Sequence, residues 1–372
     1  MSKRGVIIAA MTVILLSLSG CGSNKYMMSH QTTEEPVCTE ETKPSEKKKQ
    51  SASKQELIIY QTPEKYTYDN LMFDVAVLQE QYGDIVQPVK VCDTVDGRNV
   101  CDIIVGDQQS DNQILIMGAM HAREYITAQI VMRQLCDYLR IVSEEADGEY
   151  NSISKKALSE GITVHFIPMS NPDGVSISQF GLEGIVNQSV RDFISSISNG
   201  DYEQWKSNAE GIDLNRNFDA GWDEYIGSAG PSSDKYKGKF PGSSYEAAGL
   251  IKLTEEYGFK RTISYHTCGA LIYWYYKQID TVLEQSKLFA QQISDETGYT
   301  LDSNYQAVDA AGYKDWAVYK MGIPSITIEV GNETGHGIIN PVPISFFDSI
   351  WDRNKDVVYA AIYNLKYGTD IN

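Results

Sequence analysis

Four residues that lie far apart in the chain, His121, Glu124, His266 and Glu329, have the side chains that a hydrolytic zinc site needs. Two imidazoles and one carboxylate complete a catalytic zinc site with three protein ligands, and the fourth position stays open for water. A second carboxylate beside that water acts as the general base. The residue types therefore predict that His121, Glu124 and His266 bind one Zn²⁺ per chain and that Glu329 is the catalytic base.

The spacing of these residues fits elements that direct them toward one point. His121 follows an apolar run, residues 114–120, that is typical of a strand, and Glu124 opens an amphipathic stretch. Residues three apart on a helical turn share a face, so a strand-to-helix turn brings His121 and Glu124 to the same ion. Glu329 stands between two β-branched apolar residues in a predicted strand, where a carboxylate needs a partner or a chemical role.

The wider pattern alternates strands with helices, which is typical of an α/β domain whose sheet is covered by helices on both faces. Short apolar runs predict strands near Val100, Ile114, Val164, Ile263, Ile272 and Ile326, and helical spacing predicts helices near Val131, Leu288 and Val358. One long final helix is predicted from an apolar stripe formed by Phe347, Ile350, Trp351, Val358, Ala361, Ile362 and Leu365. Catalytic groups then collect where strands end and loops begin.

Composition narrows the choice of partners. The chain has 372 residues with 42% hydrophobic content, which is enough for one large core, and we find no internal repeat. The formal net charge of -18 repels phosphates, and no basic stripe offsets it, so the sequence argues against a nucleic-acid partner. A neutral or cationic ligand and a monomeric protein are expected.

The N-terminus has the pattern of an export signal. Basic residues precede an apolar run at residues 6–18, which is shorter than the ~20 residues of a membrane-spanning helix. The run ends in L-S-G-C, which is similar to a bacterial lipobox, in which the cysteine becomes the lipidated first residue. We predict a lipoprotein signal peptide over residues 1–20 and lipidation of Cys21. The alternative is an ordinary cleaved signal peptide followed by a chance cysteine.

The segment after Cys21 is polar and lacks the apolar residues that would stabilise an ordered chain. We predict a disordered tether over residues 21–57 and a catalytic domain over residues 58–372. The protein is then expected to be exported and anchored through lipid to the outer face of a bacterial cytoplasmic membrane.

Cys92 and Cys101 flank a predicted β-hairpin. Asp96-Gly97 is the strongest short hairpin signal and takes the two turn positions in this interpretation. Counting outward places Cys92 opposite Cys101 at a non-hydrogen-bonded pair, within reach of a disulfide. Because the predicted compartment is oxidising, we predict that bond. The alternative is a pair of packed free thiols.

Four motifs in order along the chain resemble the zinc carboxypeptidase family: G-A-M-H-A-R-E at 118–124, N-P-D-G at 171–174, G-I-D-L-N-R-N-F at 211–218 and S-Y-H-T at 264–267. The resemblance is closer to its bacterial branch of γ-D-glutamyl-diamino-acid (diaminopimelate) peptidases, through S-Y-H-T-C-G-A-L-I-Y-W, G-Y-K-D-W and I-N-P-V-P-I-S-F-F-D. It implies a single domain with a mixed, twisted β-sheet and helices on both faces.

The resemblance also implies roles around the metal. Asn215 and Arg216 resemble the clamp for a substrate's terminal carboxylate, for which the arginine fork is suited because it makes two parallel charge-assisted bonds. Tyr305 resembles the mobile tyrosine that closes over that carboxylate. Asp213 resembles the acid that orients a zinc histidine through its other ring nitrogen. Arg123 is expected to line the cleft.

One position departs from the family pattern. The family places an arginine that stabilises the tetrahedral oxyanion before the G-x-D-x-N-R motif, and this chain has Glu210 there. Losing one oxyanion donor costs on the order of 100-fold or more in rate. Either Lys206, Arg191 or another basic residue replaces that arginine, or the enzyme is slow.

The leading hypothesis is a zinc peptidase that trims peptidoglycan stem peptides, as a carboxypeptidase or as a γ-D-glutamyl-diamino-acid peptidase. In that case Asp309 pairs with a free amine of the substrate, although a loop aspartate is also a common turn residue. A second hypothesis is a general extracellular metallocarboxypeptidase that acts on nutrient peptides. The third is a lipoprotein that binds wall peptides without cleaving them.

Overall fold

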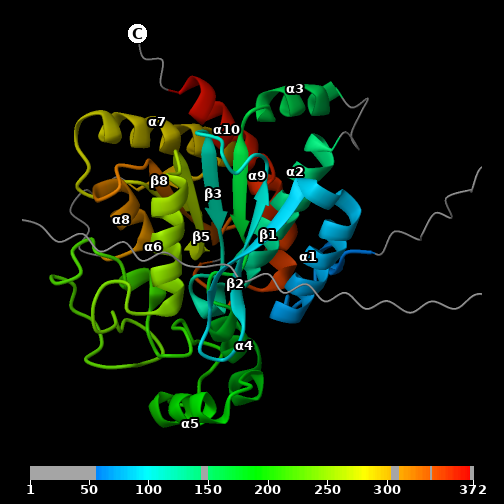
Figure 1. The fold of residues 1–372 in the computed structure, drawn as a ribbon. Helices are drawn as coiled ribbons and strands as arrows, with labels where there is room; N and C mark the ends of the chain where they lie inside the picture. The colour runs from blue at the N-terminus through cyan, green and yellow to red at the C-terminus, as the bar shows by residue number, and fades with distance from the viewer. Residues whose placement is uncertain (1–55, 144–149, 303–309, 336, 369–372) are drawn as a thin grey trace, which may run out of the picture. The chain divides into compact units, whose positions relative to one another are not determined.

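An eight-stranded mixed β-sheet forms the centre of the described chain (Figure 1). This computed structural model describes residues 56–143, 150–302, 310–335 and 337–368. The predicted signal peptide, Cys21, nearly all of the predicted tether, Tyr305 and Asp309 lie outside the described residues. The predictions made for them stay predictions.

The sheet has the strand order β1-β2-β4-β3-β5-β8-β6-β7. Its four central strands, β4, β3, β5 and β8, are parallel, and antiparallel pairs flank them on both sides. The mixed sheet that the resemblance implied is therefore confirmed, and so are all six strands that the apolar runs predicted. The strands are β1 (Val86–Asp93), β2 (Asn99–Val105), β3 (Gln113–Met117), β4 (Thr163–Ile167), β5 (Arg261–Gly269), β6 (Leu271–Tyr273), β7 (Thr300–Leu301) and β8 (Ser325–Gly331).

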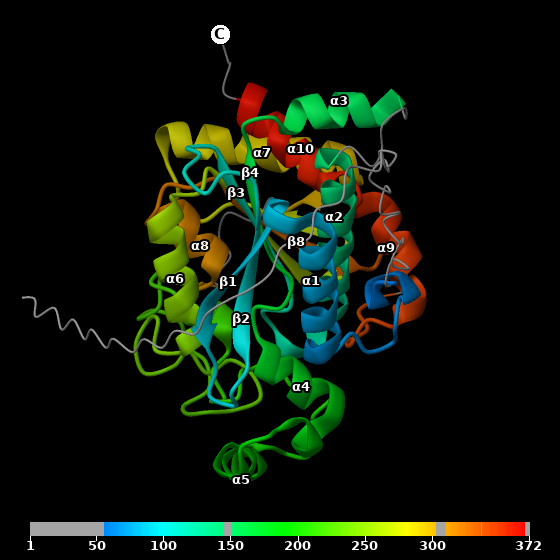
Figure 2. The ribbon, with the colours of Figure 1, turned by 45° about the vertical axis from the view of Figure 1, so that its right-hand side comes forward.

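Helices cover both faces of this sheet. Figure 2 shows α6 and α8 on one side and α1, α2 and α9 on the other. Within the described ranges, the α-helices are α1 (Tyr68–Tyr82), α2 (Ile126–Val142), α3 (Tyr150–Ser159), α4 (Pro172–Phe180), α5 (Gln188–Ile197), α6 (Tyr245–Tyr257), α7 (Asp280–Thr297), α8 (Tyr313–Tyr319), α9 (Phe347–Asn354) and α10 (Val357–Tyr367). None of the helices in these ranges combines the length and the apolar character that crossing a bilayer requires.

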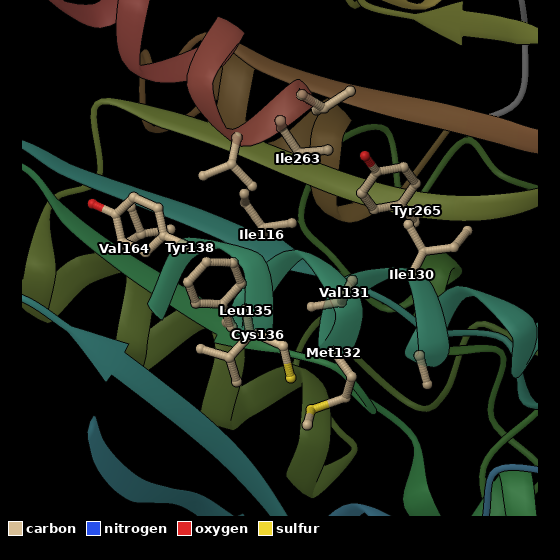
Figure 3. Close-up of a cluster of buried hydrophobic side chains, with 14 of the residues drawn as sticks. Ile116, Ile130, Val131, Met132, Leu135, Cys136, Tyr138, Val164, Ile263 and Tyr265 are labelled. Atoms are coloured by element: carbon tan, nitrogen blue, oxygen red, sulfur yellow. The ribbon is translucent and has the colours of Figure 1, made fainter. Parts of the chain in front are cut away.

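Successive side chains of β3 point to opposite faces of the sheet and pack in two different hydrophobic clusters. Ile114 and Ile116 point into the larger cluster under α2, whereas Leu115 and Met117 belong to the cluster under α6 and α8. Figure 3 shows Ile116 near the α2 residue Leu135 in the larger cluster. A strand that is buried on both faces needs the continuous apolar run that the sequence shows here.

The predicted long final helix is wrong in one respect, because the structure has two helices there, α9 and α10. Asn354 ends α9 with a buried side chain, whose Nδ2 donates to the carbonyl of Ile350 and to the hydroxyl of Tyr299. The apolar stripe continues across the break, since Phe347 and Ile362 are buried in the same cluster. The apolar periodicity therefore predicted the buried face correctly but did not indicate the break between α9 and α10.

The predicted disulfide is also wrong, because Cys92 and Cys101 are free thiols in the structure. Cys92 lies opposite Val100, and a register shift after Lys90 places Cys101 opposite Lys90. Cys101 is buried in the larger cluster, whereas Cys92 packs against the cluster under α6. The two thiols therefore lie on opposite faces of the sheet.

The hairpin has this register because Asp96 binds backbone groups that are distant in the sequence. Its carboxylate accepts the backbone N–H groups of Val186 and Asn187 at 2.7–3.0 Å and pairs with Arg98 at 2.6 Å. The loop closes instead through Thr94, whose N–H donates to the carbonyl of Arg98 at 2.8 Å. Asp96 therefore anchors the hairpin to the chain before α5 rather than occupying a two-residue turn.

Candidate zinc site

Metal-ligating atoms from three buried residues converge where the parallel strands end. The Nδ1 atom of His121 lies 2.9 Å from Glu124 Oε1, and the Nδ1 atom of His266 lies 2.9 Å from Glu124 Oε2. The two Nδ1 atoms are 3.1 Å apart. In the part of the chain that the structure describes, His121, Glu124 and His266 form the single group of this kind that could hold a metal ion.

The spacing and chemistry of these atoms fit Zn²⁺. Ligand bonds of about 2.0–2.1 Å in a tetrahedral site put neighbouring ligand atoms about 3.3 Å apart, close to the observed separations. Two imidazole nitrogens that face each other beside a carboxylate are a donor set that suits a shared Zn²⁺. The predicted zinc ligands, His121, Glu124 and His266, are therefore confirmed.

The hydroxyl group of Thr127 forms hydrogen bonds within the turn that carries two of these ligands. The side chain of Thr127 accepts the N–H of Ala119 at 2.7 Å and donates to the carbonyl of Glu124 at 2.7 Å. Ala119 adopts a left-handed conformation with φ 48°, and a Cβ on Gly118 would lie 2.8 Å from the Thr127 carbonyl oxygen. The turn between β3 and α2 is thus tight and locked, so it holds His121 in place.

Asp213 contacts the far side of the His121 ring, as the resemblance implied. Its Oδ1 lies 3.2 Å from His121 Nε2, and its Oδ2 accepts the N–H of Lys235 at 3.1 Å. Since Nδ1 of His121 faces the ligand group, Nε2 carries the proton that Asp213 accepts. This contact sets the tautomer that a metal-bound histidine requires.

Both carboxylates next to His121 are held in the charged form. Burial alone raises the pKa of Glu124, but the two histidines outweigh it and hold that pKa well below its usual value. Asp213 behaves in the same way, since His121, Arg216 and Lys206 lower its pKa against the effect of burial. A buried carboxylate that stays ionised is a suitable ligand or ligand partner for a divalent cation.

Sheet register places Glu329 beside a zinc ligand. Glu329 and His266 are direct partners on the parallel strands β8 and β5. Burial, together with the nearby charge of Glu124, raises the pKa of Glu329 to about 7, against the opposing charges of His266, Lys206 and Arg216. Its side chain is only half-buried, so it is open to a water molecule. A carboxylate with this pKa beside the ligand group is suited to general base catalysis near neutral pH.

The predicted clamp residues lie at the short 3-10 helix η5 (Leu214–Arg216). Arg216 Nη1 donates to the carbonyl of Asn215 at 2.7 Å, and its guanidinium lies 5.2 Å from the ring centroid of Tyr225. Asn215 Oδ1 accepts the N–H of Tyr313 at 3.0 Å, which fixes its amide group. The charge of Arg216 acts on both Asp213 and Glu329, so Arg216 lies near the ligand group.

Arg123 is tied to a neighbouring segment. Its Nη1 donates to Gln204 Oε1 at 3.0 Å, and Gln204 Nε2 donates to the carbonyl of Asn340 at 2.6 Å. Arg123 therefore joins the turn that carries His121 to two other loops, which is a structural role beside the expected one.

The structure also shows where the candidates to replace the family's arginine lie relative to the zinc ligands. Glu210 is directed toward Asn208, whose Nδ2 lies 3.4 Å from Glu210 Oε2. Arg191 lies on α5 and donates to the carbonyl of Ile185. Lys206 lies beside the zinc ligands, with Nζ 3.9 Å from Glu124 Oε1.

Sequence reasoning missed one residue that supports the site, Thr127, and one buried acid away from the ligands, Glu246. Thr127 had a usable signal, because a hydroxyl three residues after a ligand can bond back to the turn that carries it. Glu246 had none, since an acidic residue in the first turn of a helix looks like an ordinary solvent-exposed position. It is in fact buried, and its Oε2 accepts from Asn208 Nδ2 at 2.9 Å.

Comparison with known proteins agrees with this geometry. Residues 74–356 match the family described as "Zinc carboxypeptidase". The chain is 28% identical to γ-D-glutamyl-L-diamino acid endopeptidase 1 of Lysinibacillus sphaericus over 302 residues, which cover 80% of this chain and 72% of that protein. It is 24% identical to carboxypeptidase B of Astacus astacus over 294 residues, which cover 74% of this chain and 89% of that protein.

Solved structures show the same fold. Bovine thrombin-activatable fibrinolysis inhibitor, in complex with tick carboxypeptidase inhibitor, aligns with a TM-score of 0.63 and 19% identity over 83% of this chain and 99% of that one. Carboxypeptidase A from Helicoverpa armigera aligns with a TM-score of 0.59 and 17% identity over 82% of this chain and 73% of that one. Because these sequence identities are low, the similarity to the solved structures concerns the fold alone.

Proposed function

Because this chain belongs to the zinc carboxypeptidase family, we propose that it is a zinc peptidase that trims cell-wall stem peptides at or near the bond between D-glutamate and a diamino acid. The observation that carries the peptidase function is the open three-ligand group with Glu329 as the register partner of His266. Support for a wall substrate is the 28% identity to γ-D-glutamyl-L-diamino acid endopeptidase 1.

The residues of the site divide the work of hydrolysis. His121, Glu124 and His266 hold Zn²⁺, which when bound polarises the scissile carbonyl and acidifies water. Asp213 keeps His121 in the tautomer that leaves Nδ1 for the metal. Glu329 takes a proton from the attacking water and returns it to the leaving amine.

Arg216 gives the site a preference for acidic groups on the substrate. A stem peptide offers the carboxylate of the diamino acid and the α-carboxylate of D-glutamate. The guanidinium beside Asn215 is suited to bind one of them through two parallel hydrogen bonds. Tyr305, outside the described residues, is proposed to close over that carboxylate.

The test is cleavage of purified stem peptides by the zinc-loaded protein, followed by mass spectrometry. Loss of a C-terminal residue is expected for a carboxypeptidase, and a cut after D-glutamate for a diamino-acid peptidase. Glu329→Gln should abolish either product while the protein still binds zinc. Cleavage of ordinary peptides at equal rates would refute the preference for wall substrates.

A second candidate is a general extracellular metallocarboxypeptidase. The similarity to carboxypeptidase B of Astacus astacus supports it, and so does the Asn215–Arg216 pair, which is suited to any C-terminal carboxylate. In that case the protein should remove C-terminal residues from unrelated peptides with a comparable kcat/KM.

We also propose that Cys21 is lipidated and anchors the protein outside the cytoplasmic membrane. The L-S-G-C motif after an apolar run supports this location. Cells that express the full chain should incorporate radiolabelled palmitate into it, and Cys21→Ala should prevent this labelling. Equal labelling of the variant would exclude a lipid anchor at this position.

A further inference from the structure

Two acids meet the same amide group in the chain that leads to Asp213. The Nδ2 atom of Asn208 donates to Glu246 Oε2 at 2.9 Å and lies 3.4 Å from Glu210 Oε2. Glu246 lies in the first turn of α6 and is almost fully buried, whereas Glu210 is half-buried. The acid that departs from the family pattern is therefore turned away from the zinc ligands and toward a second acid.

The surroundings of Glu246 favour its neutral form. Within the described ranges, no hydrogen bond reaches its Oε1. Asp173 of α4 and Glu210 are the charged groups that act on its pKa, and both raise it. Arg98 pairs with Asp173 at 3.0 Å, and the thiol of Cys92 on β1 packs against α6. A buried carboxylate among these groups would lack a positive partner, so Glu246 is suited to keep a proton.

A proton fits this place better than a metal ion does. Asn208 directs N–H donors at both carboxyl groups, and a cation held between the two acids would meet these donors. Lys239 also opposes the rise in the pKa of Glu210, whereas burial and the neighbouring acids raise the pKa of Glu246 to about 8. The proton therefore belongs to Glu246.

Asn208 closes residues 205–213, which we call the Asn208 loop. Its Oδ1 accepts the backbone N–H groups of Glu210 and Ile212, both at 3.0 Å. Its backbone carbonyl accepts from Trp205 Nε1 at 3.3 Å. The shape of the loop thus depends on the orientation of one amide side chain, and that side chain is held by its bond to the acid of α6.

The Asn208 loop contacts the turn that carries two zinc ligands. The carbonyl of Lys206 accepts the N–H of Ala122 at 3.0 Å. At the end of the loop, Asp213 Oδ1 lies 3.2 Å from His121 Nε2. A shift of the loop would therefore move the carboxylate that fixes the tautomer of a zinc ligand. Losing such a partner typically costs about 10- to 100-fold in metal affinity or activity.

We propose that Glu246, in its protonated form, is a positioning residue that holds the Asn208 loop, and through it Asp213, against His121. This proposal rests on the proposed peptidase function. When Glu246 loses its proton, a buried negative charge lies beside two other acids, and opening the loop to water relieves the repulsion. Asp213 then leaves His121. One proton passes to the solvent, and no covalent bond to carbon or nitrogen changes.

The first test is hydrogen exchange of the zinc-loaded protein without substrate, measured on peptides that span residues 206–213. Dividing each exchange rate by its intrinsic rate at the same pH gives the opening equilibrium of the loop. In wild-type protein, opening should become about tenfold more favourable for each unit between pH 5.5 and pH 7.5, because it returns the pKa of Glu246 from about 8 toward 4.5. Glu246→Gln keeps an acceptor for Asn208 without a charge, so its opening equilibrium should not change with pH.

The second test is the pH profile of kcat on the peptide that wild-type protein cleaves. With a pKa of about 8, roughly a tenth of Glu246 keeps its proton at pH 9, so kcat should fall about tenfold between pH 7 and pH 9. Glu246→Gln should remove this fall, and Glu255→Gln, at an exposed position on the same helix, should retain it. Glu210→Gln should move the fall to lower pH, because ionised Glu246 then meets one fewer like charge.

The outcomes separate the two proposals. Wild-type protein that cleaves no peptide at any pH would refute the proposed function, while hydrogen exchange would still decide whether Glu246 holds the loop. Equal pH dependence of loop opening in wild-type protein and Glu246→Gln would overturn the positioning role. The same holds for an active Glu246→Gln variant whose kcat falls between pH 7 and pH 9 as in wild-type protein.

Discussion

Replacing Glu246 with glutamine should stabilise the protein, and the gain should grow with pH. Glu246 lies in the first turn of α6 and is almost fully buried. Burial, together with the nearby Asp173 and Glu210, raises its pKa from 4.5 to about 8, and the hydrogen bond from Asn208 opposes that rise only in part. At neutral pH the folded protein therefore keeps a proton that the unfolded chain releases.

The sign and size follow from linkage. The pKa of Glu246 is higher in the folded state, so stability is fully present below pH 4.5 and is lost as the pH rises toward 8. Each pH unit in that window costs about 1.4 kcal/mol, or about 3 kcal/mol between pH 4.5 and 7. Glu246→Gln has the shape of the protonated acid and avoids this loss.

The assay is urea unfolding of zinc-saturated wild-type protein and Glu246→Gln at pH 5 and pH 8. Other titrating groups cancel in the difference between the two proteins. We expect a difference below about 1 kcal/mol at pH 5 and of several kcal/mol at pH 8. Glu255→Gln, at an exposed position on the same helix, should show no such change. A difference that is the same at both pH values would refute the reasoning.

Three further predictions concern the metal site and the core. Thr127→Val removes the hydroxyl that bridges the turn of Glu124, so it should cost about 1–3 kcal/mol in urea unfolding and weaken zinc binding in a chelator competition; unchanged zinc affinity would contradict it. Asp102→Asn removes a buried carboxylate that lies 2.6 Å from His165 Nδ1 and should cost about 1–3 kcal/mol in urea unfolding, whereas an unchanged free energy of unfolding would contradict it. Removing zinc by dialysis against a chelator should lower the Tm, and added zinc should restore it in wild-type protein but not in His266→Ala.

Local patterns were sufficient to predict the framework of the site. The apolar run of β3, the three-residue spacing of His121 and Glu124 and the helical period of α2 are all short-range features. A strand that is buried on both faces and an amphipathic helix leave few ways to arrange the turn between them. The ligand group and the alternation of strands and helices could therefore be predicted.

Features that depend on distant partners could not be predicted in this way. The hairpin register differs because Asp96 binds backbone groups about 90 residues away in the sequence. The break between α9 and α10 depends on Asn354, whose side chain bonds to Tyr299. The place of Lys206 depends on its contact with Ala122. In each case a polar group is satisfied by a partner that no local pattern reveals.

The pairing of His266 with Glu329 across β5 and β8 constrains how this enzyme can vary. Both residues lie inside strands, so about 4.8 Å of interstrand spacing sets their separation, whatever the length of the loops. Deleting one residue from either strand would turn that side chain to the opposite face of the sheet. Insertions are therefore tolerable in the connecting loops but not within the two strands, because there they would change the register that pairs the metal ligand with the base.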